Sequence, residues 1–154
     1  MIRYVGLLLA LSGLLSGCAS TGQVPDSGTE FTLAGCSPFL NCVSSESSVG
    51  VYQVAPITLA EPLNQERWAR VRAAALALPG AALNNARYGY LDITCYSDVF
   101  HFPDFLEVLA GPGGQQLAVR SQSMLGLYDF GVNRNRVETL RQALIAQGLA
   151  RPAQ

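Results

Sequence analysis

Residues 100–124, FHFPDFLEVLAGPGGQQLAVRSQSM, decide the fold because they hold two extended segments around the strongest turn signal of the chain. That signal is Gly111-Pro112-Gly113-Gly114. The segments on either side of it, 100–109 and 116–124, are predicted strands. Strands joined by so short a connection pair antiparallel, so we expect a β-hairpin.

The register of this hairpin follows from a two-residue turn at 113–114. Such a turn places Val108 opposite Val119 on one face of the hairpin. It also places Glu107 opposite Arg120 on the other face, where the two side chains form an oppositely charged pair. One register thus matches an apolar pair and a charged pair together.

Two more strands are predicted outside the hairpin. Residues 88–96 alternate between apolar side chains and a tyrosine-rich set, which indicates a half-buried strand with the tyrosines on its outer face. Residues 51–59 look extended, and Pro56 restricts that strand to a sheet edge or a strand start.

Two helices are predicted from apolar residues at helical spacing. The first follows Asn64 as N-cap and ends at Pro79-Gly80. The second follows Asn135, which forms a capping-box pattern with Glu138, and ends at Gly148. The element order is strand, helix, three strands in a meander, helix, so we expect an α+β fold in which an antiparallel sheet carries both helices on one face. The apolar stripes are Trp68, Val71, Ala75 and Leu78 in the first helix and Val137, Leu140 and Leu144 in the second.

The amino-terminal residues resemble a bacterial lipoprotein signal. Arg3 is the positive residue, 5–15 is a short apolar run, and Leu15-Ser16-Gly17-Cys18 is similar to a lipobox. The apolar run is shorter than the about 20 residues that a transmembrane helix needs. The resemblance implies that 1–17 is a signal peptide and that Cys18 carries a diacylglycerol, which makes the membrane a partner of the protein.

The rest of the chain is predicted to be a tether and one domain. Residues 18–32 show no period and form a flexible tether, and 33–150 form a single α+β domain. Because Ala19 follows the cysteine where an inner-membrane protein usually has aspartate, we expect the periplasmic face of the outer membrane. The outer leaflet of the inner membrane is the alternative.

The charge balance excludes some partners. Ten basic and eleven acidic residues give the chain a formal net charge of −1, so a nucleic-acid partner is not expected. The chain also lacks a glycine loop between a strand and a helix that would hold a phosphate, and we expect no cofactor.

The cysteines are expected to act in an oxidising compartment. With Cys18 assigned to the lipid, Cys36 and Cys42 are the preferred disulfide pair, and Cys95 is expected to be a free thiol in a buried strand. A zinc site that includes His101 is the alternative, but the cysteine spacing is wider than that of the usual ligand pair. No metal site is expected.

Two motifs resemble the bacterial family of domain of unknown function 1499 (DUF1499). Residues 36–45, CSPFLNCVSS, are similar to its opening Cys-Pro-x-x-Pro-Asn-Cys-Val-Ser-Ser. Residues 120–138 resemble its closing Arg-Ser-x-Ser, Gly-x-x-Asp-x-Gly-x-Asn-Arg-x-Arg-x-Glu signature. The resemblance covers about 33–149 and implies no activity. The chain departs from the family where it keeps only Asp104 and Glu107 of a larger acidic set, and where Met124 replaces a usual arginine.

Polar residues of the closing signature form a candidate site for an anion or another ligand. Arginine suits forked recognition of carboxylate or phosphate, and a helix start adds partial positive charge. In the alternative, structural interpretation, Arg120 pairs with Glu107 while Asp129 and Asn133 satisfy loop amides. The candidate residues are Arg120, Asp129, Asn133, Arg134 and Arg136.

These features favour a non-catalytic envelope module that binds a lipid, an acyl chain or a cell-wall component. Aromatic residues are candidates to line its groove. A structural or interaction protein of the envelope, with unknown protein partners, is the alternative. A serine hydrolase is a further alternative, but the chain has no Gly-x-Ser-x-Gly elbow. The aromatic residues are Tyr88, Tyr90, Tyr96, Phe100 and Phe102, and the hydrolase would use Ser121, Ser123, His101 and Asp129.

Overall fold

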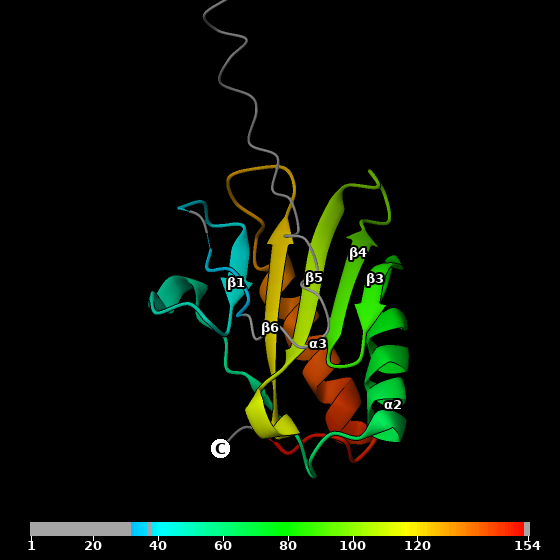
Figure 1. Ribbon diagram of the computed structural model, residues 1–154. Coiled ribbons are helices and arrows are strands. Elements are labelled where there is room, and N and C mark those ends of the chain that lie inside the picture. Colours follow the sequence, from blue (N-terminus) through cyan, green and yellow to red (C-terminus); the bar gives the residue numbers. More distant parts are fainter. Residues whose placement is uncertain (1–31, 37, 153–154) are drawn as a thin grey trace, which may run out of the picture.

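The computed structural model describes residues 32–36 and 38–152, which form one antiparallel sheet and two main helices (Figure 1). The strands follow the order β1-β6-β5-β4-β3, and β2 pairs with β6 on the same side as β1. The predicted α+β fold is confirmed. The strands are β1 (Cys42–Ser44), β2 (Ile57–Thr58), β3 (Ala81–Arg87), β4 (Tyr90–Tyr96), β5 (Pro103–Ala110) and β6 (Gln116–Ser123). The helices are α2 (Gln65–Leu76) and α3 (Val132–Ala146), with short 3-10 turns η2 (Gly50–Tyr52) and η3 (Pro112–Gly114).

The hairpin β5–β6 has the predicted register. Val108 pairs with Val119, and Glu107 pairs with Arg120. The prediction of a two-residue turn is wrong. The connection is longer, contains η3, and is closed by a hydrogen bond of 2.8 Å from Gly111 N to Gln116 O. The longer loop is centred on the same point of the chain as the shorter one, so the register does not change.

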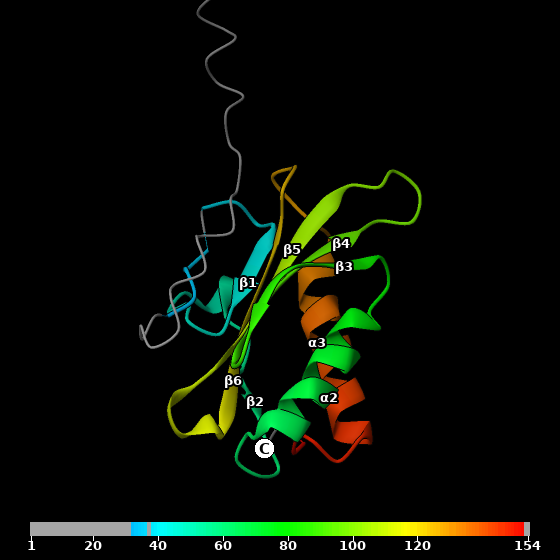
Figure 2. The ribbon, with the colours of Figure 1, turned by 45° about the vertical axis from the view of Figure 1, so that its right-hand side comes forward.

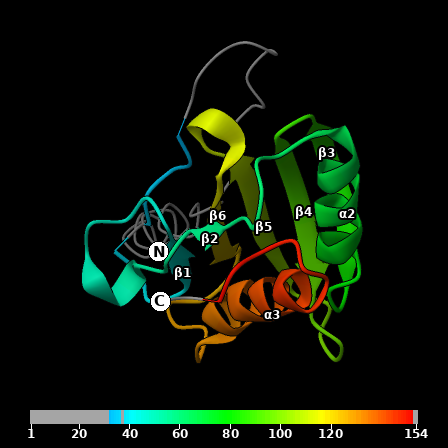
Figure 3. The ribbon, with the colours of Figure 1, turned by 90° about the horizontal axis from the view of Figure 1, so that it is seen from below.

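Both helices cover the same face of the sheet, as predicted (Figures 2 and 3). The two predicted apolar stripes are buried, and they pack against side chains that alternate strands send to this face. Leu91 and Ile93 of β4 and Leu106 and Val108 of β5 are the centre of this core, each 0 % exposed. In the described part of the chain, no helix is long and apolar enough to cross a membrane.

One of the two predicted helix caps is confirmed. Asn64 caps α2, since its Oδ1 accepts a hydrogen bond of 2.8 Å from Arg67 N. The capping box predicted for α3 is absent, because α3 begins at Val132 and Asn135 lies inside the helix. Asp129 takes the capping role instead, and its two carboxylate oxygens accept from the N–H groups of Gly131 and Asn133 at 3.0 and 2.9 Å.

Three predictions about strands need correction. Strands β1 and β3 were not expected, and β3 is built from AALNNAR, which has neither alternation nor β-branched residues. A tight turn at Tyr88-Gly89, where Gly89 has φ 83°, pairs β3 with β4. The strand expected over 51–59 is reduced to β2, directly after Pro56.

The outer face of β4 is also not the exposed tyrosine surface that was expected. Tyr90, Asp92 and Thr94 are 1 %, 5 % and 5 % exposed, whereas Tyr88 and Tyr96, at the two ends of the predicted row, are exposed at 46 % and 44 %. Side-chain hydrogen bonds between β3 and β4 explain why Asp92 and Thr94 are buried on this face. The Asn84 amide of β3 donates to Asp92 Oδ1 at 3.1 Å and to Thr94 Oγ1 at 2.8 Å.

The predicted disulfide is present. Cys36 and Cys42 are bonded, with Cα atoms 5.6 Å apart, so neither sulfur is available as the zinc ligand that the alternative required. Cys95 is a free, buried thiol, as expected. The lipoprotein signal, Cys18 and the predicted tether up to residue 31 lie outside the described residues.

Candidate functional site

The closing signature of the chain is divided between the two faces of the sheet. Arg120 and Ser121 are neighbours in β6, so their side chains point to opposite faces. Arg120 lies in a row with Ser44, Glu107 and Asp92, on the face that no described helix covers. We call this the helix-free face. Ser121 lies on the helix side, so the predicted candidate residues do not meet in one site.

Asn133 is the centre of a buried polar network on the helix side. It is 0 % exposed, although it lies in the first turn of α3. Its Nδ2 donates to Asn41 O, Ser123 Oγ and Asp129 Oδ2 at 3.0, 2.8 and 2.8 Å. Its Oδ1 accepts from Ser121 Oγ at 2.7 Å. One side chain therefore connects α3, β6 and the segment before β1.

Arg136 extends this network to strand β5. Its Nη2 forms an ion pair of 2.6 Å with Asp104 Oδ2, and its Nη1 donates to Asn133 Oδ1 at 2.6 Å and to Ser121 Oγ at 3.0 Å. Cys95 is the cross-strand partner of Asp104, and burial raises the pKa of its thiol while Arg136 partly offsets the effect. The guanidinium of Arg136 is thus already bound by protein groups.

A second polar cluster lies on the helix-free face. Glu107 accepts from Arg120 Nη1 at 3.0 Å and from Tyr90 Oη at 2.9 Å, and Arg120 also donates to Gln122. Burial and the neighbouring Glu107 raise the pKa of Tyr90, which keeps its hydroxyl a donor. The predicted pairing of Arg120 with Glu107 is therefore present, and an anion at Arg120 would compete with this carboxylate.

Arg134 is separated from both clusters. Its Nη1 and Nη2 donate to the carbonyl oxygens of Gln53 and Val51 at 2.8 and 3.0 Å, which ties α3 to the segment around η2. Asp129 caps α3. Each of the five predicted candidate residues is therefore bonded to protein groups, and the geometry brings together Asp129, Asn133 and Arg136 alone.

The residues of the hydrolase alternative do not form a triad. Ser121 is 0 % exposed, and its Oγ lies 3.0 Å from the Phe105 carbonyl oxygen and 2.7 Å from Asn133 Oδ1. His101 lies in the exposed loop between β4 and β5, and no hydrogen bond within 32–36 and 38–152 joins it to Ser121 or Ser123. A substrate would not reach the hydroxyl of Ser121 in this fold.

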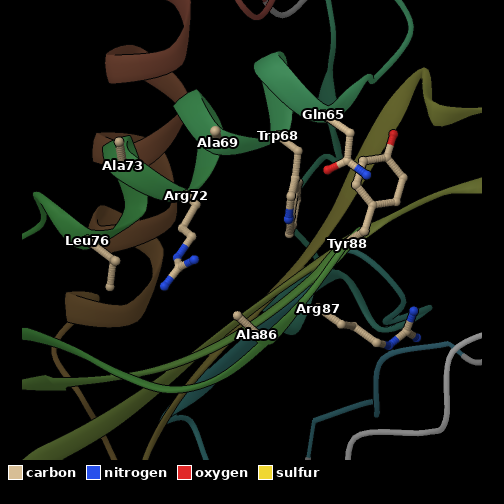
Figure 4. A pocket seen from close by; sticks show the side chains of 9 residues that line it. All are labelled: Gln65, Trp68, Ala69, Arg72, Ala73, Leu76, Ala86, Arg87 and Tyr88. Atoms are coloured by element: carbon tan, nitrogen blue, oxygen red, sulfur yellow. The ribbon is translucent and has the colours of Figure 1, made fainter.

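A hollow of the described surface lies elsewhere, between α2 and the edge strand β3. This groove has a volume of about 600 Å³ (Figure 4). Trp68, whose ring meets that of Tyr88 at 6.2 Å, closes one part of it. In Figure 4, Arg72 and Leu76 extend from α2 toward β3, and Arg87 points away from the helix. The lining residues are Gln65, Trp68, Ala69, Arg72, Ala73, Leu76, Ala86, Arg87 and Tyr88.

The sequence of α2 carries a signal for this groove. Gln65, Ala69, Arg72, Ala73 and Leu76 form a second stripe at helical spacing, beside the core stripe of α2. Of the five aromatic residues expected to line a groove, Tyr88 does so. Tyr90 is buried in the sheet, while Tyr96, Phe100 and Phe102 are exposed at its far end.

The described residues contain no group of three or more His, Cys, Asp or Glu side chains that could hold a metal ion. Comparison with protein families finds a match over residues 32–144, to the family described as "Protein of unknown function (DUF1499)". Comparison with curated proteins and with solved structures finds no match.

Proposed function

The chain belongs to the DUF1499 family of proteins of unknown function, and from this starting point we propose that it is a non-catalytic binding module of the cell envelope. Its ligand is an amphiphile with an apolar chain and an anionic group, such as a lipid or an acylated cell-wall component. The ligand occupies the groove between α2 and β3. The alternative, a structural protein that acts through protein partners, needs no ligand in this groove.

The groove between α2 and β3 is the observation that supports this proposal. Its volume of about 600 Å³ lies inside the range of about 300–1,000 Å³ that ligand sites occupy. Five of its nine lining residues are apolar, namely Trp68, Ala69, Ala73, Leu76 and Ala86. It follows α2 over 65–76, which is about 16 Å of helix. Such a surface favours an extended apolar chain.

Arg72 supplies the charge that selects the ligand. It is exposed, lines the groove and forms no ion pair with any residue in the described part of the chain. A guanidinium beside apolar side chains binds carboxylate or phosphate through paired N–H donors. The groove therefore suits an amphiphile whose anionic end lies at Arg72.

The binding of such an amphiphile is measurable through Trp68, the one tryptophan of the chain. Titration with decanoate below its micelle concentration should change Trp68 fluorescence. Arg72→Glu should weaken binding roughly tenfold or more, because it replaces an attraction by a repulsion. Arg70→Glu is the matched control, since it makes the same change on α2 at a residue that bonds to Gln147 O outside the groove. Equal affinities of both variants, or no response of Trp68, would contradict the proposed site.

The proposed location depends on Cys18. We propose that the mature chain begins at this cysteine, carries a lipid on its sulfur and stays on the periplasmic face of the outer membrane. Cys18→Ala should release or mislocalise the protein, which cell fractionation and labelling with a radioactive fatty acid will measure. Wild-type protein that is found soluble and unlabelled in the periplasm would refute the anchor.

A further inference from the structure

Exposed apolar side chains gather at one end of the sheet. Eleven of the fifteen large hydrophobic residues exposed in the described structure lie in segments 38–40, 96–102 and 124–132, so the distribution is strongly one-sided. We call these three segments the apolar end. Val99, Phe100 and Phe130 are the most exposed, at 78 %, 73 % and 84 %.

The three segments lie at the same end of the sheet (Figures 1 and 2). A hydrogen bond of 3.1 Å from Met124 N to Pro103 O holds the ends of the second and third segments together. Leu40 is bound on both sides by the third segment, since its N donates to Leu127 O at 2.9 Å and its O accepts from Asp129 N at 3.2 Å. Backbone hydrogen bonds therefore join the first segment to the third, and the third to the end of the second.

The backbone of Phe130, at the apolar end, is strained although its side chain is exposed. Phe130 has φ 55°, a left-handed conformation that a bulky side chain rarely adopts, and yet its ring is almost fully in solvent. The ring meets Tyr128 at 4.8 Å, edge to face. Folding gains little from so exposed a ring, so an external partner explains its presence better than packing does.

We propose that the apolar end inserts into the lipid surface to which the protein is anchored, so that the domain stands on the membrane in a fixed orientation. This inference rests on the proposed lipid anchor at Cys18. The disulfide between Cys36 and Cys42 ties the start of the described chain to β1, and Asn41 O accepts from Ser123 N at 2.9 Å where β6 enters the apolar end. The stretch from Cys18 to Thr32 reaches at most about 50 Å. The chain that leads from the anchor thus enters the domain along β1, the strand that follows the first segment of the apolar end.

The chemistry of the apolar end fits the membrane interface. Its three segments contain no arginine or lysine, and their titratable charges are Asp98, His101 and Asp129, of which Asp129 caps α3. Attraction to anionic lipid therefore contributes little, and insertion depends on apolar side chains. Phenylalanine, tyrosine and leucine at loop tips are suited to the boundary between head groups and acyl chains.

Tryptophan probes in the full-length lipoprotein will test this orientation. Phe100→Trp and Phe130→Trp place probes on the apolar end, and Gln115→Trp is the control, because Gln115 is exposed between η3 and β6 at the opposite end of the sheet. Each variant is reconstituted in phosphatidylcholine vesicles with or without brominated acyl chains. The wild-type emission, which comes from Trp68, is subtracted from that of each variant. We expect the emission of the two tip probes to shift to the blue, and brominated lipid to quench about half of its intensity or more. The emission of the control probe should not change.

The outcomes separate insertion from anchoring. Equal quenching of all three probes, or no quenching at the tips of a protein whose mass shows the lipid on Cys18, overturns the insertion while the anchor remains. Quenching of the tips when vesicles are added to protein with an unmodified Cys18 supports an insertion that does not depend on the anchor, and the mass of the native protein decides the anchor separately. Tip probes that shift in native membranes but not in vesicles overturn the lipid surface in favour of a protein partner.

Discussion

Asn133→Leu should lower the free energy of unfolding by about 3–5 kcal/mol, one of the largest losses expected for a single substitution in this protein. The side chain of Asn133 is fully buried and bonds to Asn41 O, Ser123 Oγ and Ser121 Oγ. Leucine has nearly the same volume but removes these hydrogen bonds: Ser123 Oγ loses its partner, while Asn41 O and Ser121 Oγ each lose one of their bonds. A buried polar group that loses its partner costs about 1–3 kcal/mol, and the apolar side chain also lies beside the charged Asp129 and Arg136.

Urea unfolding followed by circular dichroism will measure this loss. Asn135→Leu is the matched control, because Asn135 is an exposed residue of the same helix and the capping role predicted for it is absent. The control should change the free energy of unfolding by about 0.5 kcal/mol or less. If Asn133→Leu does not fold, Ser121→Ala gives a milder test, with an expected loss of about 1–2 kcal/mol. Equal, small losses at 133 and 135 would show that the network does not hold the fold.

The pair Glu107 and Arg120 should give the second large effect. Each side chain is less than one-tenth exposed, and their charged atoms are 3.0 Å apart. Glu107→Gln or Arg120→Met alone leaves a buried charge without its partner, with an expected loss of about 3–5 kcal/mol. The double variant removes both charges, so its loss should be smaller than the sum of the two single losses.

A double-mutant cycle from denaturant unfolding of the four proteins will measure the coupling between Glu107 and Arg120. Additive losses would mean that each residue contributes through other contacts. Glu107 also accepts from Tyr90, and therefore Glu107→Gln, which keeps an oxygen acceptor there, is a better test of charge than Glu107→Ala.

Local chemistry explains which parts of the fold were predictable. The register of β5 and β6 follows from a glycine-rich turn and two complementary pairs, and the helix faces follow from apolar spacing, because both signals lie within one short stretch of sequence. The start of α3 was not predictable in this way. Asp129 and Asn135 are both good caps by residue type, and burial of Asn133 against β6 decides between them.

The groove was not predictable, because no sequence pattern indicates that its two walls, α2 and β3, lie side by side. Its β3 wall lacks alternation and β-branched residues, and it forms because the Tyr88-Gly89 turn pairs it with β4. The candidate binding residues were predictable as polar and paired, as Arg120 with Glu107 shows. Their division between two faces follows from the alternation of β6, which places Arg120 and Ser121 on opposite sides.

Native mass spectrometry of the gently purified lipoprotein tests the central claim most directly, since it shows whether the groove holds a ligand. The account predicts that the wild type carries a lipid or an acylated cell-wall fragment beyond the mass of the chain and its covalent lipid. Ala73→Phe, which fills the groove, should lose this mass, and Ala146→Phe at the end of α3 should keep it. A wild type without added mass, or an unchanged ligand in Ala73→Phe, would contradict the binding module and favour an envelope protein that acts through partners.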